Sequence, residues 1–165
     1  IYAYYDSKGD ILHHIIEKGL QSLKADIENA VNNHAGFVEA CRAVCSAMSR
    51  YRTECPHSLE SLNRSGAAKI EPLAISDTVK SILRLGTEIN DILEALIVRG
   101  QKSGEVRKDI VPVLTVYVLS TNLDSLLALA ETKGKFICAQ NGMTEDEFLD
   151  YGFRQIINSI LEVRI

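Results

Sequence analysis

The sequence predicts an all-α fold, a bundle of about five to six helices. Long segments carry hydrophobic residues at three- and four-residue steps, which is the period of an α-helix with one buried face. The chain contains only three prolines and no tryptophan, and few of the alternating runs that characterise β-strands. Its 165 residues, 46% hydrophobic and 24% charged, suffice for one domain with its own core.

The first expected helix begins at Ser7, which can cap it, with Asp10 as the acidic half of a capping box. It ends at Asn32-Asn33, and its buried face is Leu12, Ile16, Leu20, Leu23, Ile27 and Val31. The second helix ends before Pro56, because proline disfavours helix in the residue before it. Its buried stripe is Phe37, Cys41, Val44, Cys45 and Met48.

Residues 55–74 are expected to be irregular, with a short helix around Leu59 and Leu62. A third helix is expected over residues 76–103. Gly104 can end it in the left-handed conformation, and Asp109 can cap the next helix. The short turn predicts that these two helices are antiparallel neighbours.

The fourth helix is expected over residues 110–133, followed by a loop that contains Gly134 and Gly142. A capping box over residues 144–147 then starts the last helix. Both helices are more apolar than a single surface helix, which predicts a homodimer through a four-helix bundle. The residues expected in the dimer interface are Leu123, Leu127, Phe153, Ile156, Ile157 and Ile160.

No apolar run approaches the ~20 residues that span a bilayer, and no signal peptide precedes the first helix. We therefore expect a cytoplasmic protein without membrane contact. The four cysteines lack C-x-x-C spacing and are interpreted as reduced thiols. The net charge of −4 does not favour a polyanion-binding surface. Neither a phosphate-binding glycine loop nor a nucleophile elbow occurs, so no enzyme, cofactor or metal is expected.

Two segments resemble known motifs. Residues 1–12, IYAYYDSKGDIL, resemble the segment that closes the DNA-binding domain of TetR-family transcriptional regulators. Residues 100–109, GQKSGEVRKD, are similar to the turn that precedes the two dimerisation helices of that family. Gly9 stands where an acidic residue is common in the first motif.

This resemblance implies a ligand-responsive repressor in which residues 1–8 are the remnant of a helix-turn-helix domain and residues 9–165 form the ligand-binding and dimerisation domain. It implies DNA phosphate contacts at Tyr2, Tyr4 and Lys8, and operator DNA bound through the missing N-terminal domain. It also implies a small apolar effector in a pocket among the helices. The expected pocket residues are Leu20, Ile27, Cys41, Cys45, Met48, Ile89 and Tyr117.

Two alternatives remain open from the residues. One is a stand-alone helical adapter without a DNA role. The other is a thiol or metal sensor on the same scaffold, built on Cys41 and Cys45 with Cys55 or His57 as a third ligand. Against the sensor, unpaired cysteines on a buried stripe are commonly small apolar core residues.

Overall fold

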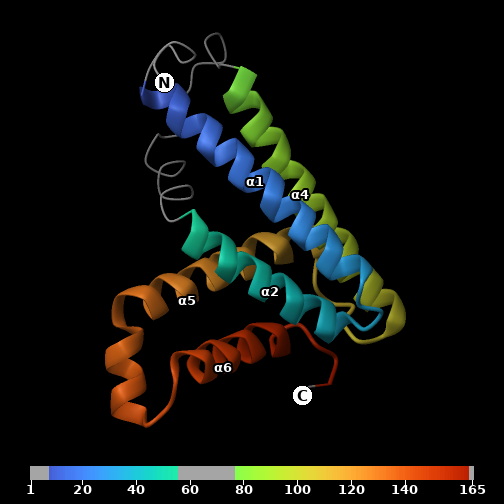
Figure 1. The fold of residues 1–165 in the computed structure, drawn as a ribbon. Helices are drawn as coiled ribbons and strands as arrows, with labels where there is room; N and C mark the ends of the chain where they lie inside the picture. Colours follow the sequence, from blue (N-terminus) through green and yellow to red (C-terminus); the bar gives the residue numbers. More distant parts are fainter. Residues whose placement is uncertain (1–7, 56–76, 164–165) are drawn as a thin grey trace.

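The computed structural model describes residues 8–55 and 77–163 of the chain (Figure 1). These residues form five helices and no strand, apart from an isolated bridge between Val106 and Leu161. The all-α prediction is therefore confirmed. The expected cap Ser7 and the short helix around Leu59 lie outside the described residues. The helices are α1 (Lys8–Asn32), α2 (Phe37–Glu54), α4 (Asp77–Ser103), α5 (Pro112–Asn141) and α6 (Glu145–Asn158).

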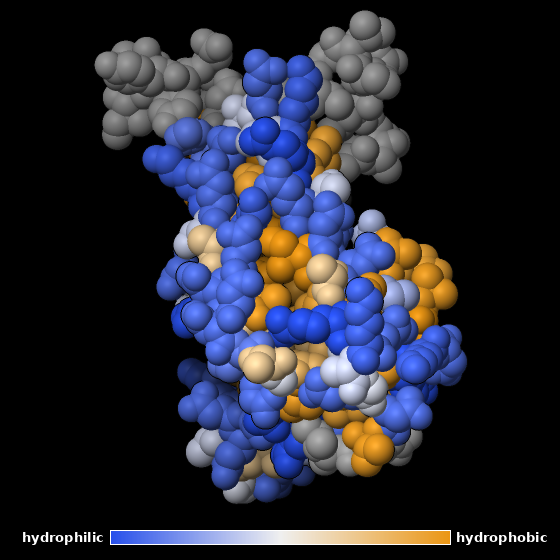
Figure 2. All heavy atoms as spheres, turned by 90° about the vertical axis from the view of Figure 1, so that its right-hand side faces the viewer, coloured by the Kyte–Doolittle hydropathy of each residue, from blue (hydrophilic) through white to orange (hydrophobic). Residues whose placement is uncertain are grey.

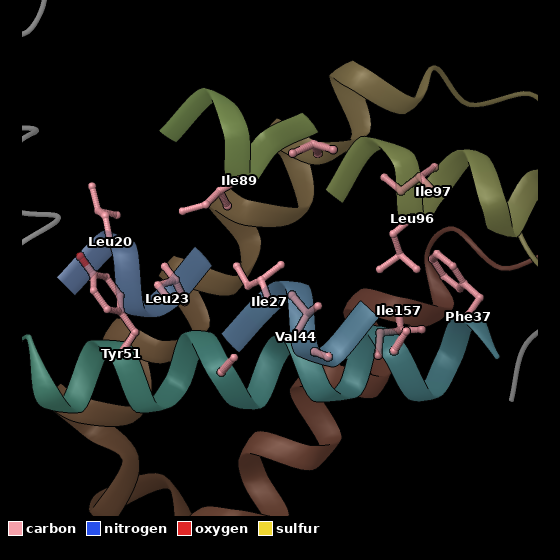
Figure 3. Packing of buried hydrophobic residues seen from close by; sticks show 14 of the residues in the cluster. Leu20, Leu23, Ile27, Phe37, Val44, Tyr51, Ile89, Leu96, Ile97 and Ile157 are labelled. Carbon is pink, nitrogen blue, oxygen red and sulfur yellow. The ribbon is translucent and has the colours of Figure 1, made fainter. Parts of the chain in front are cut away.

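Helices α1, α2 and α4 pack together and hold most of the core. Figure 1 shows α1 and α4 side by side in the same direction, with α2 running back against them. Figure 3 shows Leu20, Leu23 and Ile27 of α1 between side chains of α2 and α4. The expected stripe of α1 is thus buried in this core. On α4, Leu85 is buried in this core, whereas Leu83 is 48% exposed.

Helices α5 and α6 lie against the other side of α2. Two ion pairs connect the layers, one between Arg52 and Glu131 (2.7 Å) and one between Arg42 and Asp150 (2.9 Å). A turn separates α4 from α5 as expected, but α5 then crosses α2 rather than returning along α4 (Figure 1). The two helices are therefore neighbours, as predicted, but they are not antiparallel, because α5 packs against α6 as well as α4.

Helix α5 extends beyond its expected end. Gly134 lies within the helix, buried, and the helix ends only at Gly142, which has the left-handed φ of 64°. A helix tolerates an internal glycine at a cost of about 1 kcal/mol, whereas a left-handed φ ends it. At the other end Val111, rather than Asp109, is the N-cap residue, and Pro112 occupies the first turn.

The capping box of α6 is confirmed. The Thr144 hydroxyl accepts a hydrogen bond from the Glu147 N–H (3.2 Å), and the Glu147 carboxylate accepts one from the Thr144 N–H (2.7 Å). The helix is amphipathic, with Asp146, Asp150 and Gln155 exposed. The expectation that α6 is too apolar for a surface element is therefore wrong, because its hydrophobic side faces α5 and α2 within the same chain.

Most of the exposed large hydrophobic side chains among the described residues lie on α5. Leu114, Val118 and Phe136 are 61%, 59% and 65% exposed, and Tyr117 is 57% exposed. Figure 2 shows hydrophobic residues in the middle of the visible face and at its right-hand edge, among mostly hydrophilic residues. The sequence predicted an excess of exposed apolar surface on both C-terminal helices, whereas the structure shows it mainly on α5.

By length and composition, α5 is the one helix in the described ranges that could cross a membrane. The sequence expectation concerned unbroken apolar runs, whereas α5 meets this limit through its mean hydropathy over a window that includes polar residues. Length and composition are weak evidence for a membrane span, since helices of water-soluble proteins also meet them. Asn122 and Asp124 interrupt the middle of the helix, and burial raises the pKa of the Asp124 carboxyl.

A junction at the turn between α4 and α5 connects the ends of three helices, α1, α2 and α4. The Arg99 guanidinium of α4 donates hydrogen bonds to the carbonyl oxygens of Val31 and His34 at the end of α1 (both 3.0 Å). The Glu105 carboxylate accepts a hydrogen bond from the Phe37 N–H at the start of α2 (3.0 Å). These charges lie at the helix termini that the helix dipole favours for each sign.

The same junction holds the chain that follows α6. The Arg107 N–H donates to the carbonyl of Ile160 (3.0 Å), and the Glu162 N–H donates to the carbonyl of Glu105 (2.9 Å). Gly100 lies at the centre, where its carbonyl accepts hydrogen bonds from the N–H groups of Glu105 and Val106 (both 3.0 Å). The motif of residues 100–109 is therefore a packing centre as well as a turn.

We expect Gly100→Ala to destabilise the fold by about 1–3 kcal/mol, as overpacked cores do. A Cβ there would lie 2.5 Å from Val106 Cγ2 and 2.7 Å from Phe37 Cδ2. Gly86→Ala on the same helix is the matched control, because its Cβ meets no atom within 4 Å. It should stabilise the helix by about 0.5–1 kcal/mol. Urea denaturation of both variants measures the difference, and equal stabilities would contradict the packing role of Gly100.

Candidate ligand cavity

A cavity lies where α2 and α4 meet α5 and α6. About 70 Å³ within it can be occupied by the centre of a water molecule. Side chains from all four helices line it, and nearly all are apolar. They are Cys41, Val44, Cys45, Met48, Leu93, Leu96, Ile97, Val116, Leu119, Ser120, Leu123, Ile156, Ile157 and Ile160.

Three of the seven expected pocket residues line this cavity, namely Cys41, Cys45 and Met48. All three come from the apolar stripe of α2. The structure places three others, Leu20, Ile27 and Ile89, in the core shared by α1, α2 and α4 (Figure 3). Leu20 and Ile27 do not line the cavity because they belong to α1, which contributes no lining residue, and Ile89 lies one turn before the part of α4 that does.

Tyr117, the remaining expected pocket residue, is 57% exposed and lies outside the cavity lining. The face of α5 that carries Tyr117 also carries Leu114 and Val118, which are exposed as well. The adjacent side chain Val116 is buried and lines the cavity in its place. A helix that is apolar on nearly every side gives no sequence signal for which face turns inward.

The residues expected in the dimer interface all lie within one chain. Four of them, Leu123, Ile156, Ile157 and Ile160, line the cavity. The other two, Leu127 and Phe153, pack in a cluster with Cys45. Because α5 and α6 bury these side chains against α2, the same residues are not available for a partner unless the helices separate. The sequence already marked the four lining residues as apolar positions on two helices. Because a cavity is lined by apolar residues from facing helices, they could have been predicted as lining residues.

The lining is neutral. Within the described part of the chain no charged side chain lines the cavity, and Ser120 contributes its only hydroxyl. Burial raises the pKa of both the Cys41 and Cys45 thiols, that of Cys45 to about 12. Arg99 near Cys41 and Arg42 near Cys45 lower these pKa values only partly. Both cysteines are therefore protonated thiols near neutral pH.

Comparison with known proteins gives a fold and no sequence family. Neither a protein-family model nor a curated protein matches the sequence. Among solved structures, the TetR family transcriptional regulator PfmR from Thermus thermophilus aligns with a TM-score of 0.68 and 21% identity, over 94% of this chain and 78% of that one. The fold is TetR-like.

Two further solved structures share this TetR-like fold. A protein of unknown function from Rhodococcus sp. RHA1 has a TM-score of 0.74 and 15% identity, covering 96% of this chain and 77% of its own. The superantigen pfit has a TM-score of 0.64 and 16% identity, covering 99% of this chain and 80% of its own. Neither neighbour with a stated function is described as an enzyme. Because a regulator and a superantigen share it, the TetR-like fold alone does not decide function.

The expected DNA contacts are not part of the described site. Tyr2 and Tyr4 lie outside the described residues, and only the backbone of Lys8 is described, as the first residue of α1. The third-ligand candidate His57 of the metal-sensor alternative also lies outside them. Across residues 8–55 and 77–163, no group of three His, Cys, Asp or Glu side chains could hold a metal ion.

We expect Cys45 to react slowly with iodoacetamide in the folded chain, because alkylation requires the thiolate. With its pKa raised to about 12 from 9.0, its labelling at pH 8–9.5 should be at least ~10-fold slower than in urea. The folded chain keeps a proton that the unfolded chain loses above about pH 9, so stability should fall as the pH rises beyond that value. Mass spectrometry of labelled peptides measures each site, with the less buried Cys55 as the internal control. Equal rates at Cys45 in both states would contradict its burial.

Proposed function

We propose that this chain is the effector-binding and dimerisation part of a DNA-binding transcriptional repressor located in the cytoplasm. The observation that carries the proposal is the TetR-like fold, aligned with the regulator PfmR over 94% of the chain. The two sequence segments that resemble TetR motifs support it independently, because one of them forms the junction that fixes the helix ends.

The arrangement of α1 suits such a role. Figure 1 shows the N-terminal halves of α1 and α4 extending beyond α5 and α6. In the proposed protein the DNA-reading helices precede α1, and residues 1–8 join them to it. A change in the tilt of α1 would then change the separation of two recognition helices, which DNA requires to be about 34 Å.

The cavity supplies the effector site. It lies between α2 and α4 on one side and α5 and α6 on the other. An apolar effector that favours one orientation of these layers would move the junction, because the backbone of Ile160, a lining residue, is hydrogen-bonded to Arg107. Such coupling changes affinity by about 5–150-fold in other allosteric proteins.

The thiol and metal sensor is the weaker alternative. Its first two residues, Cys41 and Cys45, do lie together in the cavity lining. Their raised pKa values disfavour the thiolates that oxidants and metals require. The helical adapter remains the alternative of a different class, and DNA binding decides between it and the repressor.

We expect the gene product that carries this chain to protect a palindromic DNA site upstream of its own or a neighbouring operon, since a two-fold dimer reads two half-sites. DNase footprinting measures the protection. The control is residues 1–165 expressed alone, which should protect no site because the DNA-reading helices are proposed to lie before them. Failure of the whole gene product to protect a palindrome at any locus would favour the adapter.

We also propose that two copies join through the exposed face of α5, which comprises Leu114, Tyr117 and Val118 with Leu129 and Phe136 further along. Burying apolar surface stabilises by roughly 25 cal/mol per Å². Large exposed patches of this kind mark interaction sites in soluble proteins. This face is proposed in place of the interface residues expected from the sequence, because those residues pack within the chain, fully or partly buried.

We expect Leu114→Glu to shift the chain toward monomers, because it places a charge in the proposed interface. Leu83→Glu on α4 is the matched control, since Leu83 is also a half-exposed leucine on a helix but lies on another face. Sedimentation velocity at micromolar concentration measures the change, with a dimer dissociation constant raised at least ~10-fold for a loss of about 1.4 kcal/mol. A dimer that resists Leu114→Glu, or a wild-type monomer, would contradict this interface.

A further inference from the structure

The chemistry of the cavity restricts what can occupy it. We propose that the cavity binds a small, uncharged organic molecule no larger than a single substituted ring, with an apolar body and one hydrogen-bonding group directed at Ser120. This inference deepens the proposed function by naming the effector class, and it is tested without DNA.

The size of the cavity sets the upper limit. A single water needs about 10–15 Å³ of the space that its centre can occupy. The 70 Å³ measured in the same way therefore correspond to about five to seven water-sized positions. A monocyclic ring or a short aliphatic chain fits this space, whereas a long acyl chain or a polycyclic compound requires the helices to move apart.

The absence of lining charges sets the polarity. Among the described residues that face the cavity there is no cation to pair with a carboxylate and no anion to pair with an ammonium group. A buried, unpaired charge is strongly unfavourable. Arg42 and Arg99 cannot supply the missing charge, because Arg42 pairs with Asp150 on the surface and Arg99 holds the end of α1. An ionised ligand is thus excluded by the same geometry that stabilises the fold.

Ser120 supplies the one strong polar contact. Its hydroxyl forms no hydrogen bond with the part of the chain that the structure describes, in contrast to Thr115 and Thr121 on the same helix, which bond to carbonyls one turn back. It can therefore donate to, or accept from, a ligand. Water is a poor occupant, because it needs two to four polar partners and the described lining offers one hydroxyl and two weakly polar thiols.

The two thiols favour reversible binding. Burial keeps Cys41 and Cys45 protonated near neutral pH, so they contribute polarizable contacts rather than nucleophiles. A ligand that occupies the cavity lies against both thiols and against Met48. Thioethers and thiols adapt well to aromatic rings, which makes a monocyclic aromatic compound a suitable probe.

Four probes built on the same benzene ring test the proposal on the 165-residue chain: benzyl alcohol, toluene, benzoate and benzylammonium, of which benzyl alcohol and benzylammonium match in size. Chemical shifts of the methyl groups of Val116, Leu123 and Ile157, which line the cavity, report binding by NMR titration. We expect benzyl alcohol and toluene to shift these signals saturably. Benzoate and benzylammonium, which carry the same ring with a charge, should leave them unchanged.

Variants at Ser120 distinguish the hydrogen bond to its hydroxyl from the volume of the cavity. Ser120→Ala should weaken benzyl alcohol by about 3–10-fold and leave toluene unaffected, because toluene makes no hydrogen bond. Ser120→Leu should abolish the binding of both by filling the cavity. Ser125→Leu is its matched control, since Ser125 is exposed on the same helix, and it should leave both affinities unchanged. Circular dichroism confirms that each variant folds.

Each outcome decides the inference. Saturable binding of both neutral probes, with the expected response of the Ser120 variants, supports it. Binding of benzoate or benzylammonium as tightly as benzyl alcohol, or no shift with any probe, overturns it. In the second case the cavity is only an imperfection of packing, and a palindromic footprint by the whole gene product would still support the proposed repressor.

Discussion

The arrangement of the helices depends on the close approach at Gly100. Because this residue has no side chain, Val106 and Phe37 pack directly against the backbone of α4. The turn that follows then brings Glu105 to the start of α2, while Arg99 reaches the end of α1. One short segment thereby fixes the ends of three helices and the chain after α6. Any shift in one of these elements must be transmitted through hydrogen bonds of about 3 Å to the others.

The apolar side chains of helix α5 lie on two different faces. Its inner face, with Val116, Leu123 and Leu127, packs inside the chain and closes the cavity. Its outer face, with Leu114 and Val118, is exposed. A helix with hydrophobic residues on nearly every side is stable in water only when something covers each of its faces. In the proposed dimer the same helix would contact both the cavity and the second copy, which would connect occupancy of the cavity with assembly.

The TetR-like fold sets limits on function without fixing it. A transcriptional regulator and a superantigen share this arrangement of helices at 21% and 16% identity to the chain. Function therefore has to come from sites, and the described site is a neutral cavity with one hydroxyl. Its chemistry is that of noncovalent recognition, since buried thiols with raised pKa values and apolar side chains offer no group that would drive a reaction.

The sequence by itself determined the helices, because the signals for them are local. Periodic apolar residues, the capping box at Thr144 and the left-handed glycines at positions 104 and 142 act within a few residues of the chain. It also predicted that the C-terminal helices carry more apolar surface than their own contacts cover. Only the tertiary structure decided which face of α5 is buried, why Leu123 and Ile157 line a cavity rather than a dimer interface, and that Ser120 points into it. Those outcomes depend on how α5 packs against α2, α4 and α6, which involves contacts between residues far apart in the chain.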